Sequence, residues 1–149
     1  MKTEVSSEAR PRLEDQARRR AAKCIGAVSC RLTFVDAAAL TAVLAPTTPE
    51  HRLVGQQWQF ELDAATTLVT TDFALTRASV WLQRSHGVAG LRALHELAAP
   101  ALHVEWCTSA DYDRAVTALL ASGGRGADLF GTLDEQVRRR LKIGHDLRW

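Results

Sequence analysis

The sequence has few of the features that mark secreted, zinc-binding and membrane proteins. It contains three cysteines, Cys24, Cys30 and Cys107. They form no CxxC pair and are odd in number, which argues against a disulfide framework and a zinc site. No apolar run approaches the ~20 residues needed to span a bilayer. The first thirty residues lack the apolar core of a signal peptide and carry several acidic side chains. We therefore expect a cytoplasmic protein with no membrane contact.

Net charge is also small, at +2, so overall charge does not by itself indicate nucleic-acid binding. The basic residues are clustered, however, between Arg18 and Lys23 and again between Arg138 and Lys142. Such runs are either solvated helix faces or surfaces that contact phosphate groups. Trp58, Trp81 and Trp106 fall on faces predicted to be buried, which favours a role in the core over base stacking.

The order of apolar and polar segments predicts strands that alternate with helices. With 149 residues, 46% of them hydrophobic, the chain suffices for one compact domain with a sizeable core. Short apolar or β-branched runs predict strands at Leu32–Val35, Thr67–Thr71 and Leu102–Trp106. Between them lie segments with helical periodicity: Ala37–Ala45, Glu50–Leu62, Asp72 to Gly87, and Val88–Leu97. Long helical connections imply a parallel sheet covered on both faces.

The two ends of the chain are less regular. Residues 1–30 are interpreted as a basic appendage that includes a short helix at Ala17–Ala27. Residues 31–149 are interpreted as the folded domain. A helix capped by Thr108 or Ser109 ends at the glycines from Gly123 onwards, and a last helix is expected at about Leu133–Leu141. Little chain remains after it for a final strand.

Asp36 is the first candidate functional residue. It directly follows the predicted strand Leu32–Val35 and precedes a helix. Ligand sites of open α/β sheets lie at the carboxyl ends of parallel strands, so a carboxylate there is well placed for chemistry. An aspartate at this position is also a favourable helix cap, which requires no ligand.

The ordered series TFVDAAALTAVL, LVTTDFALTRASVWLQRSHG and LHVEWCTSADYDRAVTALL resembles the PIN domain. This is the nuclease module that includes the VapC-type toxins of bacterial toxin–antitoxin pairs. The resemblance covers residues 31–122 well; from about residue 123 the chain departs from the family, through divergence or a truncated reading frame. It implies an α/β fold, a three-layer α/β/α sandwich with a central parallel sheet. It also implies carboxylates that hold Mg²⁺ or Mn²⁺, an RNA substrate, an antitoxin-like protein partner and a homodimer.

The resemblance places Asp36 at the first metal-binding carboxylate of the family. The second, normally a glutamate, falls on Arg77. We expect Arg77 to point toward Asp36 and form an ion pair that replaces the dication. In the alternative, a small shift of register leaves Arg77 exposed. Asp72, at the start of the same predicted helix, is expected to be its cap.

The third carboxylate position has two candidates. Counting without gaps from Tyr112 places Gly131 there, whereas aligning the local sequence Gly131–Asp134 with the family motif selects Asp134. These two positions share a helix face, so Asp134 could partly replace a ligand one turn away. Asp134 could equally be an acidic residue favoured by the helix dipole. The fourth family position has no clear counterpart, and Asp146 is interpreted as a residue of the tail.

Two function classes follow from these positions. One is a metal-dependent endoribonuclease with Asp36 and Asp134 as metal ligands and catalytic residues, a water nucleophile, and basic runs that hold RNA. The other is a degenerate PIN-like domain without the metal that binds RNA or protein. Because Arg77 and Gly131 replace charged ligands, we predict a domain derived from such nucleases with impaired activity.

Overall fold

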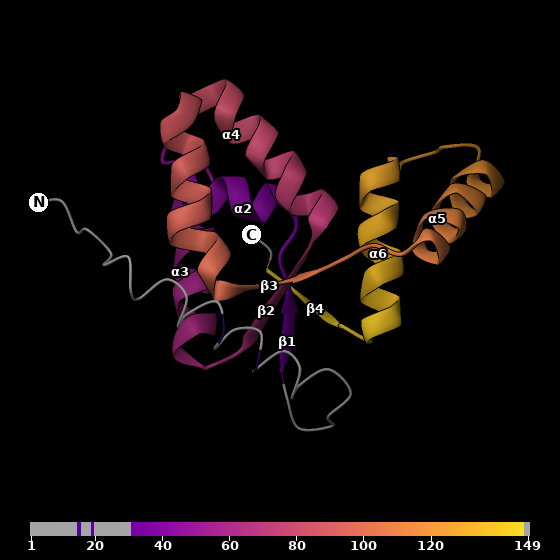
Figure 1. The fold of residues 1–149 in the computed structure, drawn as a ribbon, viewed down its shortest axis with the longest axis horizontal. Coiled ribbons are helices and arrows are strands. Elements are labelled where there is room, and N and C mark those ends of the chain that lie inside the picture. Colours follow the sequence, from indigo (N-terminus) through magenta and orange to yellow (C-terminus); the bar gives the residue numbers. More distant parts are fainter. Residues whose placement is uncertain (1–14, 16–18, 20–30, 148–149) are drawn as a thin grey trace, which may run out of the picture.

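The structure is a computed structural model that describes Asp15, Arg19 and residues 31–147. The predicted appendage at residues 1–30 therefore lies almost wholly outside the described part of the chain. A single parallel sheet is built from β1 (Leu32–Phe34), β2 (Thr67–Thr71), β3 (Leu102–Glu105) and β4 (His145–Asp146), in the order β3–β2–β1–β4 (Figure 1). The predicted α/β class with a central parallel sheet is confirmed.

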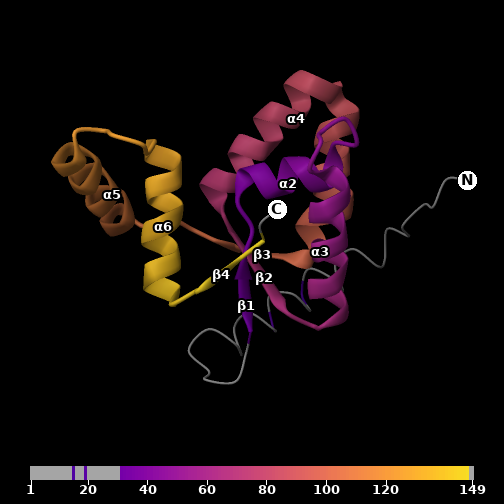
Figure 2. The ribbon, with the colours of Figure 1, turned by 180° about the vertical axis from the view of Figure 1, so that it is seen from behind.

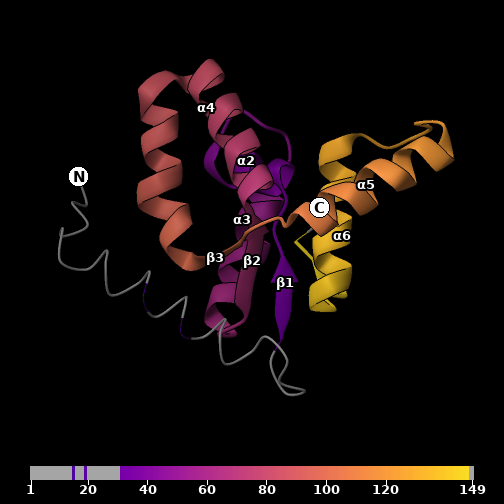
Figure 3. The same ribbon diagram turned by 45° about the vertical axis from the view of Figure 1, so that its right-hand side comes forward.

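Helices lie on both sides of this sheet, which makes the predicted three layers. One side carries α2 (Ala37–Leu44), α3 (His51–Asp63) and α4 (Asp72–Ala93). The other carries α5 (Ser109–Ser122) and α6 (Leu129–Leu141), which pack together as a hairpin (Figures 1 and 3). The view from behind shows the same separation of the two groups (Figure 2). In the described chain, no helix is long and apolar enough to cross a membrane.

Alternating side chains of the strands contribute to two apolar clusters of unequal size. Leu68 belongs to the large cluster beneath α2, α3 and α4, together with Leu40 and Leu82. Its neighbour Val69 belongs to a small cluster with Phe34 and Ile143. Successive residues of a strand point to opposite faces of the sheet, so one strand contributes to both. The small cluster attaches the α6 side of the molecule to the sheet.

The segment labelled α4 consists of two helices that meet at a kink, as the sequence pattern predicts. Gly87 has non-helical backbone angles, with φ of 64°, and ends the first of these helices. The chain continues helically to Ala93 and then through a π-helical turn, Leu94–Ala98, and a 3₁₀ turn, Ala99–Ala101. The buried face of α4 is made of small and aliphatic residues, including Ala74, Ala78 and Leu82.

Three expectations about the remaining elements are wrong. Trp81 and Trp106 are 40% and 72% exposed, so of the three tryptophans considered only Trp58 is buried in the core. Helix α6 begins at Leu129, one turn before the predicted start, because the side chain of Asp128 caps it. The chain also finds room for the short strand β4, which pairs with β1.

Candidate functional site

Asp36 stands at the junction of β1 and α2, as the sequence predicts. Its Oδ1 accepts a hydrogen bond of 2.7 Å from the backbone N–H of Ala39, so the side chain caps α2. Capping aligns the first turn of the helix and satisfies one of its free N–H groups. The capping role is thus confirmed, and it leaves the rest of the carboxylate facing the carboxyl end of the sheet.

Asp134 reaches the same end of the sheet from α6. Its Oδ1 accepts a hydrogen bond of 2.6 Å from the hydroxyl of Thr71, the last residue of β2. Burial raises the pKa of Asp134 to about 6; the hydrogen bond from Thr71 opposes this rise, and the negative charge of Asp36 adds to it. The two sequence-predicted carboxylates therefore meet at one place in the fold.

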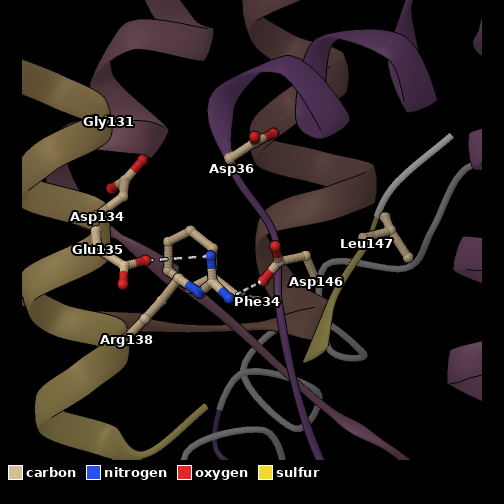
Figure 4. A pocket seen from close by; sticks show the side chains of 8 residues that line it. All are labelled: Phe34, Asp36, Gly131, Asp134, Glu135, Arg138, Asp146 and Leu147. Carbon is tan, nitrogen blue, oxygen red and sulfur yellow. Dashed lines mark ion pairs between the residues drawn. The ribbon is translucent and has the colours of Figure 1, made fainter. Parts of the chain in front are cut away.

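Asp36 and Asp134 line a pocket of about 350 Å³ between β1, β4 and α6 (Figure 4). The full lining is Phe34, Asp36, Gly131, Asp134, Glu135, Arg138, Asp146 and Leu147. Gly131 and Asp134 both face this space, as expected for positions one turn apart. The alternatives that the sequence left open for the third position thus belong to the same site.

Asp146 is not a tail residue. It lies in β4 opposite Phe34 of β1, and its carboxylate enters the pocket. Arg138 of α6 reaches across to it, with Nη2 at 2.6 Å from Oδ1 of Asp146. Sequence analysis missed this pair because a strand of two residues carries no recognisable pattern.

Arg77 does not pair with Asp36. Its Nη2 lies 3.3 Å from Oδ2 of Asp128, and its guanidinium carbon lies 5.1 Å from the ring centroid of Phe130. Both partners lie at the start of α6, so the side chain of Arg77 extends from α4 to α6 rather than to Asp36. Arg77 is also half-exposed, in agreement with the alternative that the sequence left open.

Asp72 is not the cap of α4. The cap is Thr71, whose hydroxyl oxygen accepts a hydrogen bond of 2.9 Å from the N–H of Ala74. Asp72 instead accepts a hydrogen bond of 2.9 Å from the N–H of Cys107, which follows β3. The pKa of Cys107 is raised to about 12, mainly by burial and to a smaller extent by the hydrogen bond and negative charge of Asp72. The thiol is therefore a poor nucleophile at neutral pH.

A buried carboxylate that sequence analysis did not select holds α5, α6 and the end of β3 together. Asp111 is fully buried and forms ion pairs of 2.7 Å with Arg114 and 3.0 Å with Arg140. Arg140 also pairs with Glu105 at 2.7 Å. Although burial raises the pKa of Asp111, hydrogen bonds from Thr108 and the arginines lower it to about 2. The capping-box pattern from Thr108 to Asp111 was the available signal.

The arginines of the C-terminal basic run are engaged within the molecule. Arg138 pairs with Asp146 and Arg139 pairs with Glu135, while Arg140 is held by Asp111 and Glu105. Each guanidinium thus has a carboxylate partner. Arg138 and Arg140 are partly buried in these pairs, whereas Arg139 is exposed on the surface of α6.

As they lie in this structure, the described pocket residues form no ready cluster of ligands for Mg²⁺ or Mn²⁺. Such ions require several oxygen ligands gathered in one place. In the part of the chain that the structure describes, no group of three or more His, Cys, Asp or Glu side chains is arranged to hold a metal ion. Hydrogen bonds from Ala39 and Thr71 engage Asp36 and Asp134, and a guanidinium engages Asp146. Each of these three carboxylates thus already has a donor within the protein.

Comparison with known proteins supports the fold. The sequence matches no protein-family model and no curated protein. The structure is similar to the crystal structure of Mycobacterium tuberculosis VapC20, a toxin that cleaves the sarcin–ricin loop, with a TM-score of 0.66 and 18% sequence identity. The match covers 79% of this chain and 88% of VapC20. The chain therefore has the fold of a VapC-type PIN domain, which agrees with the resemblance found in its sequence.

Proposed function

We propose that this chain is a PIN-like domain derived from metal-dependent endoribonucleases in which RNA cleavage is impaired. The proposal rests on the sequence resemblance, in which Arg77 and Gly131 fall where the family has carboxylates. The observation that supports it is that Asp128 and Phe130 engage Arg77. Metal-assisted hydrolysis depends on a cation that activates water and stabilises the charge on phosphate. Among the described residues, no cluster of three or more ligand-type side chains is arranged to hold such a cation.

The pKa of Asp134 bears on the pH at which the proposal is tested. It is raised to about 6, chiefly by burial and also by the charge of Asp36. A protonated carboxyl group is a poor ligand for a hard dication, so any metal affinity of Asp134 should fall as the pH drops through 6.

The proposal is tested by RNA cleavage with purified full-length protein. The substrate is a sarcin–ricin-loop RNA, chosen because VapC20 cleaves that loop, and VapC20 is the positive control. We expect no cleavage above background in Mg²⁺ or Mn²⁺, and the same result for wild type and Asp36→Asn. Asparagine is a matched replacement because it caps helices as well as aspartate does. Cleavage by the wild type that requires the metal and is lost in Asp36→Asn would overturn the proposal.

The active endoribonuclease of a toxin–antitoxin pair is the competing reading, and the same assay decides between the two. RNA binding without cleavage is measured separately, by fluorescence anisotropy with the same RNA at several salt concentrations. Because Arg138 and Arg140 are partly buried in ion pairs, we expect their substitution to affect stability more than RNA affinity. The antitoxin-like partner and the homodimer stay predictions from the family resemblance.

A further inference from the structure

Arg138 is the only basic side chain among the residues that line the described pocket. It comes from α6 and extends between Glu135 and Asp146, as Figure 4 shows. The distances are 2.6 Å from Nη2 to Asp146 and 3.5 Å from Nη1 to Glu135. Its guanidinium carbon also lies 5.7 Å from the ring centroid of Phe34. Contacts on three sides fix the position of this positive charge.

Burial distinguishes Arg138 from the next arginine along the helix. The side chain of Arg138 is 20% exposed and that of Asp146 is 12% exposed, whereas Arg139 is 70% exposed. An ion pair shielded from water is screened less by salt than a surface pair. Removing one partner would leave the other charge uncompensated in a partly buried place. Arg138 is thus part of the pocket wall, while Arg139 is a surface residue.

We propose that Arg138 is a tethered counterion of this pocket and that its guanidinium keeps divalent cations out. This inference rests on the proposed function and adds the residue that maintains it. The pocket holds the carboxylates of Asp36, Asp134, Glu135 and Asp146, a charge that would otherwise attract a dication. A fixed guanidinium satisfies part of that charge and repels a second cation at short range. It also engages Asp146, which is the carboxylate that β4 contributes.

This assignment differs from the ion pair expected from sequence. That expectation gave the role of replacement cation to Arg77 acting on Asp36. Arg77 instead pairs with Asp128 at the start of α6, and neither of these two residues lines the pocket. The cation that faces the pocket comes from α6, through the contact of Arg138 with β4.

The test measures Mn²⁺ binding by electron paramagnetic resonance of the free ion, with the full chain and no RNA. For wild type we expect no saturable binding at millimolar Mn²⁺. Arg138→Gln removes the charge and should bind Mn²⁺ at least tenfold more tightly. Arg138→Lys keeps the charge and should resemble wild type. Arg139→Gln removes the same charge from the helix surface and is the matched control.

Equal Mn²⁺ affinity of wild type and Arg138→Gln would overturn the inference, as would an equal gain in Arg139→Gln. Circular dichroism melting shows whether each variant folds. If Arg138→Gln does not fold, the wild type still provides a test, because Mn²⁺ broadening of the NMR signals of Asp36 and Asp134 at micromolar concentration would contradict exclusion. The RNA assay is independent: cleavage by wild type defeats the proposed function, whereas failure of Arg138→Gln to gain Mn²⁺ defeats only the role of Arg138.

Discussion

The hydroxyl of Thr71 joins the sheet to α6 by donating a hydrogen bond of 2.6 Å to Oδ1 of Asp134. The same oxygen accepts the N–H of Ala74 and so caps α4. One side chain therefore fixes three things: the end of β2, the start of α4 and the orientation of a candidate site carboxylate. This double use places structural and functional constraints on the same atom.

Thr71→Val should destabilise the protein, because it removes a buried donor and a helix cap while keeping the shape of the side chain. Loss of a cap and of a buried hydrogen bond costs about 1–3 kcal/mol. Thr71→Ser keeps the hydroxyl and should cost less. Urea unfolding measures both free energies of unfolding. The pKa of Asp134 in Thr71→Val, followed by NMR, should rise above the wild-type value because the hydrogen bond that lowers it is gone. A fall in that pKa would contradict the geometry.

Asp134 should make the folded protein less stable as pH rises from about 4 to about 6. Its pKa is raised from 3.8 to about 6 in the folded state, so the folded state holds the proton more tightly than the unfolded chain. Ionisation therefore costs stability across this window, on the order of 3 kcal/mol in total. The difference in free energy of unfolding between wild type and Asp134→Asn, measured at intervals from pH 4 to pH 7, isolates this group. A constant difference would exclude the raised pKa.

Asp111→Ala should be among the most damaging single substitutions. It removes a fully buried carboxylate and leaves Arg140 and Arg114 without that partner. Breaking a buried ion pair by removing one partner costs about 3–5 kcal/mol. The matched control is Asp113→Ala on the same helix, an exposed residue for which we expect a change within about 0.5 kcal/mol. Similar melting temperatures for the two variants would contradict the predicted role of Asp111.

The low pKa of Asp111 has its own pH signature. Because that pKa falls from 3.8 to about 2 in the folded state, the stability it contributes is complete above pH 4. It is lost as pH falls from about 4 toward 2. Wild type should therefore lose stability over that acid range faster than Asp111→Asn, as measured by urea unfolding at each pH.

Arg77→Met should change stability by less than about 1 kcal/mol, because the pair with Asp128 is half-exposed and surface ion pairs contribute little. Arg77→Glu should lower the free energy of unfolding further, since it places a second carboxylate near Asp128. Arg84→Glu makes the same charge change at an exposed position of α4 and is the control. Urea unfolding at low and high salt separates the charge effect, which should shrink with salt.

Local signals in the sequence predicted the elements that have strong local causes. The β-branched run Thr67–Thr71 became β2 with the predicted bounds, and Asp36 caps α2 as expected. Thr108 likewise caps α5. Strand propensity and capping act within a few residues, so they are visible without the fold.

Other features depend on partners that are distant in the chain. Strand β4 is two residues long and exists through its pairing with β1, more than a hundred residues earlier. The direction of Arg77 depends on where α6 packs against α4. Trp81 is exposed because the side of α4 that meets the core is filled by small alanines rather than aromatic rings. Trp106 is exposed because it follows β3 and lies outside the core. Periodicity alone cannot identify such partners.

The sequence by itself determined that strands and helices alternate, that the sheet is parallel, and that Asp36 lies at its carboxyl end. The spacing of apolar residues and caps carries that information, since it acts over single turns and strands. The tertiary structure decided which charges meet: Asp134 with Thr71, Arg77 with Asp128, and Arg138 with Asp146. Long polar side chains can reach several partners, and the packing of α6 against the sheet selects among them.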